Sequence, residues 1–324
     1  MCRKLAAFKV VLIGMALHSA VSTASAALRS SSVPLPEENA PAQTSPPAFS
    51  TPILYKQSDA HERMFIAVFD CSWKNAKNGP KESTTVHQFY DQLQAADGSS
   101  NGQVHAEYLL TDCARDNWYV DPNHGQKVFD ARLAEMYRRL GTQSATWLQQ
   151  DPGAEIRVVE VGGSWGALQA SAFAHVVDRH GIKRVASGSD GDGYAGESLI
   201  DAGKTAQVVV LLDPVGTSSD DVRLPPSVIS GFQLTAADEH RPSFKSDPLI
   251  PDGISPEGRF FGATVAGSHS DICGGYVLNG LSIRAANLAV DYINGLSDRP
   301  LLQKQSEPDD PHVNVIHRSG DEEQ

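Results

Sequence analysis

Short apolar runs alternate along the chain with segments whose apolar residues recur every three or four positions. The runs are typical of strands buried on both faces of a sheet, and they cover residues 64–69, 156–161 and 208–212, with a fourth beginning at Phe260. The helical spacing covers residues 86–93, 129–140, 167–177 and 281–296. Alternation of buried strands with amphipathic helices predicts an α/β protein, with a mostly parallel sheet and helices on both of its faces.

These elements fall within residues 61–297, which we interpret as one catalytic domain. Residues 27–60 are rich in proline and serine and have the composition of a linker. Residues 298–324 form a polar tail that ends in an acidic run, and we expect His312 and His317 to be solvated there. The Gly-rich stretch 188–196 lacks the Lys-Ser/Thr of a phosphate loop, so we interpret it as a mobile loop.

The first 26 residues read as a secretory signal peptide, which places the mature protein in the periplasm or outside the cell. A basic start is followed by the apolar run Val10–Ala16 and by the small residues Ala24, Ser25 and Ala26. The alternative is a membrane anchor, but the apolar run is shorter than the roughly 20 residues that a spanning helix needs.

The formal charge of −12 indicates which classes of molecule the protein is expected to bind. An acidic surface disfavours nucleic acid and electrostatic docking on anionic lipids, whereas a lipid substrate captured in an apolar cleft, with transient membrane contact, stays compatible. No spacing of cysteines and histidines suggests a metal site, and we expect no cofactor. Export permits one disulfide. Cys71 and Cys113 both follow strand-like segments, so a bond between them would brace the loop after the first strand; two free thiols are the alternative.

Candidate chemistry begins at Gly162–Gly166, which fits G-x-S-x-G between a predicted strand and a predicted helix. In that context the sharp turn exposes a serine hydroxyl above the sheet, which makes Ser164 the candidate nucleophile. The alternative is a glycine-rich turn without catalytic function.

A serine nucleophile needs a base and a carboxylate that orients the base, in the chain order Ser, Asp or Glu, His. Asp213 ends a predicted buried strand after Ser164; the alternative is a turn-forming residue before Pro214. His269 stands in a glycine-bounded loop after the run that begins at Phe260, and we favour it as the base. His240 is the second candidate, in a charged segment that resembles a surface loop.

The oxyanion formed during acyl transfer needs two backbone N–H donors. We expect one from Trp165, which follows the nucleophile, and one from the loop after the first strand, near Cys71 or Ser72. Asp70 is expected to hold that loop by hydrogen bonds, and Asp271 to support the histidine loop. A metal ligand or a phosphorylated nucleophile is the alternative role of Asp70, but the second acidic residue of such a motif is missing.

Five blocks of the sequence resemble, in order, an α/β-hydrolase family typified by type VI secretion phospholipase effectors. Phe69–Asn75 resembles F-D-G-T-W-N, and Gly162–Ala167 resembles G-F-S-R-G-A. Leu212–Val215 resembles a D-T-V segment, and Ala237–Phe244 resembles D-E-x-R-x-x-F. Phe260–Tyr276 resembles F-x-G-x-H-S-D-I-G-G-G-Y, the most specific of the five.

The resemblance implies the α/β-hydrolase fold, the triad Ser164, Asp213 and His269, and hydrolysis of esters, with phospholipids as substrates. The chain departs from the family where Trp165 replaces an arginine and where Cys71 and Cys273 replace glycines. We therefore expect an exported lipase or phospholipase acting on a lipid or small ester. The alternatives are a general esterase, an acyltransferase, or an idle α/β-hydrolase used for binding.

Overall fold

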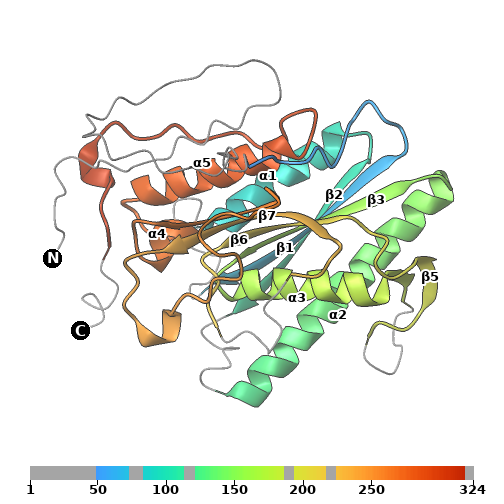
Figure 1. The fold of residues 1–324 in the computed structure, drawn as a ribbon, viewed down its shortest axis with the longest axis horizontal. Coiled ribbons are helices and arrows are strands. Elements are labelled where there is room, and N and C mark those ends of the chain that lie inside the picture. The colour runs from blue at the N-terminus through green and yellow to red at the C-terminus, as the bar shows by residue number, and fades with distance from the viewer. Residues whose placement is uncertain (1–48, 73–82, 113–120, 186–192, 217–223, 318–324) are drawn as a thin grey trace, which may run out of the picture.

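A twisted seven-stranded sheet forms the centre of the molecule (Figure 1). The structure, a computed structural model, describes residues 49–72, 83–112, 121–185, 193–216 and 224–317. The strand order is β2-β1-β3-β6-β7-β9-β8, and every neighbouring pair is parallel except β8 with β9. The strands are β1 (Glu62–Ser72), β2 (Val104–Asp112), β3 (Glu155–Gly163), β6 (Gln207–Leu212), β7 (Val228–Ala236), β8 (Gly253–Ile254) and β9 (Phe260–Val265).

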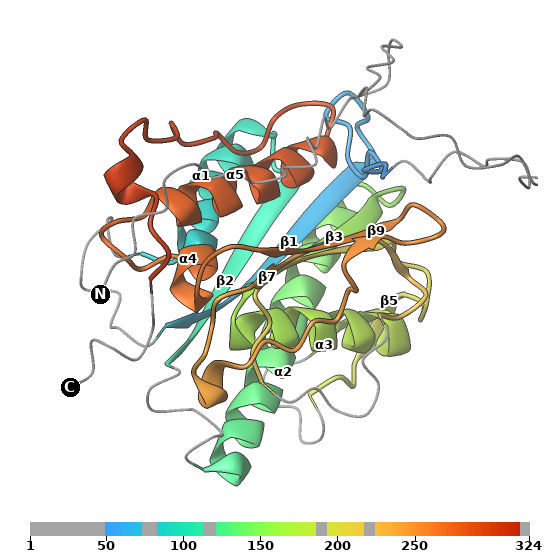
Figure 2. The same cartoon turned by 60° about the vertical axis from the view of Figure 1, so that its left-hand side comes forward.

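Helices cover both faces of this sheet, as Figures 1 and 2 show. One face carries α1 (Thr85–Ser99), α4 (His269–Cys273) and α5 (Gly280–Gly295), and the other carries α2 (Pro122–Gln150) and α3 (Trp165–His180). The smaller elements are the antiparallel pair β4 (Ile182–Arg184) and β5 (Glu197–Ile200) and the 3₁₀ turns η3 (Pro242–Phe244) and η4 (Pro311–Val313). Parallel strands with a serine turn between β3 and α3 confirm the α/β-hydrolase fold expected from the sequence.

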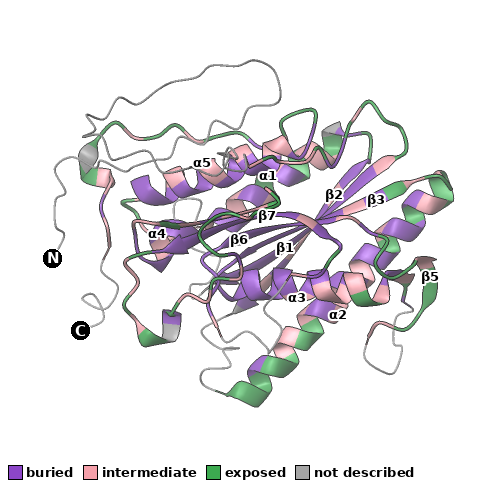
Figure 3. Cartoon of the chain, viewed as in Figure 1, coloured by how far each residue is buried: buried purple, intermediate pink, exposed green. Residues whose placement is uncertain are grey.

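The alternation of side chains along β1 explains the two layers. Met64, Ile66 and Val68 pack in the core beneath α1 and α5, whereas Phe65 and Phe69 pack beneath α2 and α3. None of these side chains is more than 1% exposed, and Figure 3 shows the central strands buried along most of their length. Because each such side chain contributes about 1.5–3 kcal/mol on burial, the sheet is a rigid platform for the groups at its carboxyl edge.

The sequence pattern did not predict β7, because its apolar residues are interrupted by Ser230, Gly231 and Gln233. The structure gives each polar side chain a partner. The Ser230 hydroxyl donates to the backbone carbonyl of Arg259 (2.8 Å), and the side-chain Oε1 of Gln233 accepts the N–H of Ile250 (3.1 Å). A strand can bury such residues when its neighbours satisfy them, and local periodicity does not contain that information.

Part of the predicted linker and part of the predicted tail pack on the domain. Leu54 is 3% exposed, and its N–H bonds to the carbonyl of Leu296 (2.8 Å). Leu302 is likewise buried, whereas His312 is exposed. The expectation that His317 is solvated is wrong, because only 12% of its side chain is exposed and it bonds to a buried carboxylate.

Candidate active site

Ser164 occupies a strained turn between β3 and α3. Its backbone dihedrals are φ 59° and ψ −131°, a left-handed φ that few non-glycine residues adopt. A Cβ atom at Gly162 would lie 2.2 Å from the carbonyl oxygen of Gly166, and one at Gly166 would lie 2.3 Å from that of Phe69. Both flanking positions therefore require glycine, which gives the G-x-S-x-G pattern its structural reason. Ser164 caps α3 without a side-chain cap bond, so its hydroxyl is left for chemistry.

Asp213 lies at the carboxyl end of β6, fully buried, with φ 42°. Its Oδ1 accepts the N–H of Ala236 (2.9 Å) and the hydroxyl of Ser246 (2.7 Å). Its Oδ2 accepts the Nδ1–H of His269 at 2.6 Å. The carboxylate is thus held by the end of β7 and by the segment after η3, and it fixes the imidazole tautomer with Nε2 free to act as a base.

His269 is the first residue of α4 and is 5% exposed. Burial alone would lower the pKa of the His269 imidazole, but its contact with the Cys273 thiol and its hydrogen bond to the Asp213 carboxylate outweigh burial and raise the pKa. We assign the rise to Asp213, because burial raises the pKa of the Cys273 thiol and keeps it uncharged near neutral pH. Cys273 is a free, buried cysteine whose thiol also donates to the carbonyl of Leu212 (3.3 Å).

The structure joins Asp213 to His269 by a hydrogen bond and joins the Ser164 turn to the Asp213 turn through the backbone. The Ser164 N–H donates to the carbonyl of Leu212 (2.9 Å), and the N–H of Val215 donates to the carbonyl of Ser164 (3.3 Å). Among the hydrogen bonds of the described residues, none links the Ser164 hydroxyl to His269. Catalytic hydrogen bonds are often long in ligand-free enzymes and shorten when substrate binds.

The end of β1 lies against the start of α3, where the oxyanion donors are expected. Trp165 begins the helix, so its N–H has no acceptor within the helix. The N–H of Cys71 is engaged by the Asp70 carboxylate at 2.8 Å, which leaves Ser72 as the candidate for the second donor. Cys71 is disulfide-bonded, and the proposed partner Cys113 lies outside the described residues, so that pairing stays a prediction.

Asp70 ties three elements together beneath this loop. Its Oδ2 accepts the hydroxyls of Thr84 (2.6 Å) and Tyr108 (2.7 Å), while its Oδ1 accepts the N–H of Cys71. Burial raises the pKa of the Asp70 carboxyl, and the three donors oppose that rise. Thr84 is the N-cap of α1, so the carboxylate connects the end of β1 to the start of α1 and to β2.

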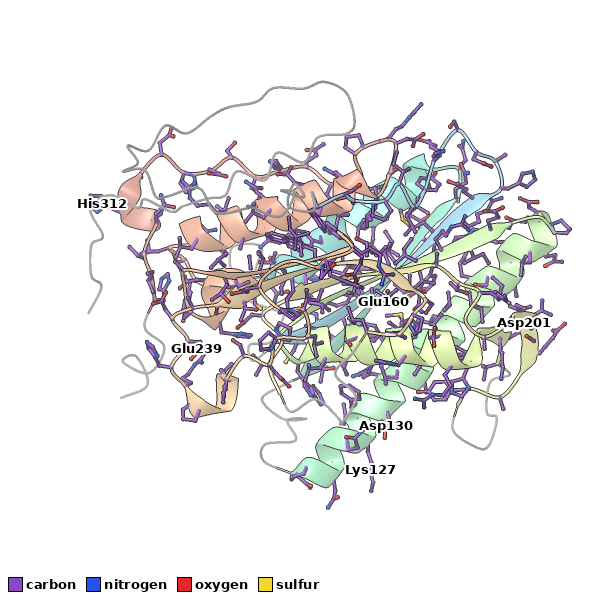
Figure 4. The ribbon with its side chains drawn as sticks, viewed as in Figure 1. Lys127, Asp130, Glu160, Asp201, Glu239 and His312 are labelled. Atoms are coloured by element: carbon purple, nitrogen blue, oxygen red, sulfur yellow. The ribbon has the colours of Figure 1, made fainter. Side chains whose placement is uncertain are left out.

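A second group of residues, whose role the sequence pattern did not predict, supports His269. The Glu239 carboxylate accepts the backbone N–H of His269 at 3.2 Å, and Arg241 binds both of its oxygens at 3.1 and 3.0 Å. Burial raises the pKa of Glu239, but the Arg241 guanidinium holds it below the usual range. Arg241 lies 3.6 Å over the Phe244 ring, which packs 5.2 Å from the imidazole of His269. Figure 4 shows Glu239 in the region of α4 and η3.

The only signal for this group was the resemblance of Ala237–Phe244 to D-E-x-R-x-x-F. His240, the second candidate base, lies within the same segment but is exposed. Asp271 is 1% exposed, and its carboxylate accepts hydrogen bonds from Ser268 and His317, so it supports the start of α4. Within the described part of the chain, no group of three or more His, Cys, Asp or Glu is placed to hold a metal ion.

Comparison with known proteins gives structural likenesses alone. Searches against protein-family models and against curated proteins returned no match. An uncharacterized protein from Pseudomonas aeruginosa is similar, with a TM-score of 0.47 and 18% identity over 79% of this chain, which spans only 48% of that protein's length. An acetyl xylan esterase (TM-score 0.28) and esterase 2 from Thermogutta terrifontis (TM-score 0.32) are each 12% identical, over 75% and 78% of this chain and 99% and 86% of their own lengths. At these scores the likenesses assign no activity to this chain.

Proposed function

We propose that this protein is an exported serine ester hydrolase with Ser164 as its nucleophile. The observation that carries the proposal is the 2.6 Å bond between the buried side chains of His269 and Asp213, beside a serine held at positive φ. A serine on such a strained turn and a buried base with its carboxylate are two features typical of acyl transfer by serine on an α/β sheet.

In the proposed mechanism the Ser164 hydroxyl attacks the ester carbonyl carbon while Nε2 of His269 takes its proton. The negative oxygen of the tetrahedral intermediate is stabilised by the N–H of Trp165 and by the N–H of Ser72. His269 then gives the proton to the leaving alcohol, and the acyl group stays on Ser164. Water, deprotonated by His269, releases the acid. Asp213 stays ionised throughout and stabilises the imidazolium.

The proposed substrates are esters with an apolar acyl chain, above all phospholipids. Trp165 belongs to an apolar cluster with Cys71 and Leu168, and the partly exposed Phe129 and Leu249 pack against it. The rings of Phe129 and Trp165 lie 5.4 Å apart. This mostly buried apolar cluster adjoins the nucleophile and suits a hydrocarbon chain, whereas the phospholipid head group is proposed from the family resemblance alone.

Export is proposed from the signal-like residues 1–26 and from the disulfide at Cys71, since disulfides persist in oxidising compartments. No helix in the portion that the structure describes has the length and apolarity to cross a membrane. In this proposal the contact with lipid is transient and made through the substrate.

A substrate panel tests the proposal. The mature protein and Ser164→Ala are incubated with phospholipid vesicles and with short-chain ester reporters. Release of fatty acid from vesicles by the wild type, with kcat lower by about 10⁴-fold or more in the variant, supports the lipase. Turnover of reporters alone reduces the proposal to a general esterase. An absence of ester turnover with both substrates contradicts it.

A further inference from the structure

After α5 ends at Gly295 the chain turns back, and residues 298–317, the C-terminal strap, run along α5 toward its first turn (Figure 2). The side-chain Oδ1 of Asn294 accepts the N–H groups of Leu301 (2.8 Å) and Leu302 (2.9 Å), and the side-chain Nδ2 of Asn294 donates to the carbonyl of Leu302 (2.9 Å). The side-chain amide of Asn294 thus satisfies backbone N–H and C=O groups of the strap, as a neighbouring strand would.

The same arrangement recurs seven residues earlier on α5. The Asn287 amide pairs with both the N–H and the carbonyl of Gln305, each at 2.9 Å. The Gln305 side chain donates to Gln88 on α1 at 2.8 Å, and the strap residue Val315 is 8% exposed. Two residues seven apart lie on one face of a helix, so α5 presents two matched amides that fix the path of the strap.

The strap ends, as far as the structure describes it, on a buried carboxylate. The Nδ1–H of His317 donates to Oδ1 of Asp271 at 2.6 Å, and the backbone N–H of His317 donates to Oδ2 at 3.0 Å. The imidazole stacks on Tyr276, with ring centroids 3.8 Å apart and an interplanar angle of 16°. The side chains of His317 and Asp271 are 12% and 1% exposed.

Asp271 is also the residue that caps α4. Its Oδ2 accepts the N–H (2.9 Å) and the hydroxyl (3.1 Å) of Ser268, the N-cap residue directly before His269. The helix has only five residues, so its position depends on this capping box more than that of a long helix would. His317 therefore binds the carboxylate that fixes the position of His269 at the start of α4.

We propose that His317 is a positioning residue: through Asp271 and Ser268 it holds the imidazole of His269 in line with Ser164. The inference rests on the proposed ester hydrolysis. If the His317 donors are lost, the buried Asp271 carboxylate is left with an unsatisfied oxygen and turns toward other donors, which displaces the cap and His269. Because misplacement of a reacting group by about 1 Å costs up to roughly 100-fold in rate, we expect the effect in kcat.

The test compares His317→Ala with His312→Ala in the full mature chain. His312 is an exposed histidine of the same strap and lies at the left-hand edge of the molecule in Figure 4, which makes it a matched control. We expect His317→Ala to lower kcat about 10-fold to 100-fold with KM unchanged, and His312→Ala to leave both unchanged. An equal kcat for His317→Ala and wild type contradicts the inference, as does a change confined to KM.

Two further variants separate positioning from general destabilisation. In His317→Asn the side-chain amide N–H stands where Nδ1 does, and in His317→Gln it stands near Nε2. Rescue of kcat by asparagine but not by glutamine supports the bond to Asp271. Rescue by glutamine alone, or the same loss in all three variants despite equal thermal stability, contradicts it.

Hydrogen exchange separates this inference from the proposed function. If wild type hydrolyses no ester, the proposed function fails, and the amides of residues 267–274 still report on the strap. Faster exchange there in His317→Ala than in wild type and in His312→Ala supports the coupling. Equal exchange in the three proteins contradicts it whatever the activity.

Discussion

Two carboxyl groups on neighbouring strands are both fully buried, but one is hydrogen-bonded by several donors and the other has none. Asp213, at the end of β6, receives donors from Ala236, Ser246 and His269. Glu160, in the middle of β3, has no hydrogen-bond partner for either oxygen, and burial raises its pKa well above the usual value. Figure 4 places Glu160 within the sheet, between the helices that cover its two faces.

The difference follows from position along the strand. A residue at the carboxyl end of a parallel strand is surrounded by loops, which bring backbone N–H groups and side chains from distant parts of the chain. A residue in mid-strand faces side chains of neighbouring strands and helices, here Ala67 and Val209 across the ladder, and those offer no donor. Asp213 is therefore held by three donors where the proposed chemistry needs it, whereas Glu160 is a carboxyl of raised pKa that adds nothing to that chemistry.

The largest expected effect comes from removing the group that makes Asp213 different. We predict that His269→Ala lowers kcat by roughly 10⁴-fold or more, because both proton transfers are lost. His240→Ala serves as the control, since His240 is exposed and bonds neither Asp213 nor Ser164, and it should stay near wild type. Steady-state kinetics of the two variants decide the matter; a larger loss in His240→Ala would move the base to that residue.

Asp213→Asn, which removes the charge and keeps the shape, should lower kcat by about 10⁴-fold. It also tests the raised pKa of His269. The base must be neutral, so activity rises with pH as the imidazole loses its proton. The acidic limb of the wild-type pH–rate profile should therefore have an apparent pKa above 6.5, the usual value for histidine. In Asp213→Asn this acidic limb should move to lower pH, because the carboxylate that raises the pKa of His269 is gone. A kcat/KM profile whose limb stays in place would separate Asp213 from His269.

Glu239→Gln should have a smaller effect, about 10-fold in kcat. The neutral amide weakens the charge-assisted bonds to Arg241 and to the His269 N–H but leaves the Asp213 bond in place. Glu135→Gln is the matched control, because Glu135 pairs with arginines on α2 away from the site. If kcat falls equally in both variants, the segment after β7 has no special role.

Glu160→Gln should leave kcat unchanged and raise stability. A carboxyl whose pKa is raised on folding contributes stability below its unfolded pKa near 4.5, and that contribution is lost as pH rises toward the folded value. The advantage of the variant in unfolding free energy should therefore grow by about 1.4 kcal/mol per pH unit over that window. Denaturant unfolding at several pH values measures it; a constant difference would mean that Glu160 is ionised or partnered.

The sequence predicted the features that are determined by residues close together in the chain. The glycines at 162 and 166, the strand before them and the helix after them identify the serine turn, and Asp213 and His269 follow in the expected order. Contacts between distant segments were beyond reach: the hydrogen bond from the Tyr108 hydroxyl to Asp70, and the hydrogen bond between His317 and Asp271. Nothing in a run of neighbouring residues reveals partners that lie 38 and 46 positions apart.

Covalent labelling tests the central claim most directly. A fluorophosphonate reacts with a serine only where a base activates the hydroxyl and the site accepts a tetrahedral oxyanion. The account predicts that the wild-type protein is labelled at Ser164, as found by mass spectrometry of the modified peptide, and that His269→Ala is labelled at least roughly 10³-fold more slowly. A wild-type protein that is not labelled, or that is labelled at another residue, contradicts the account.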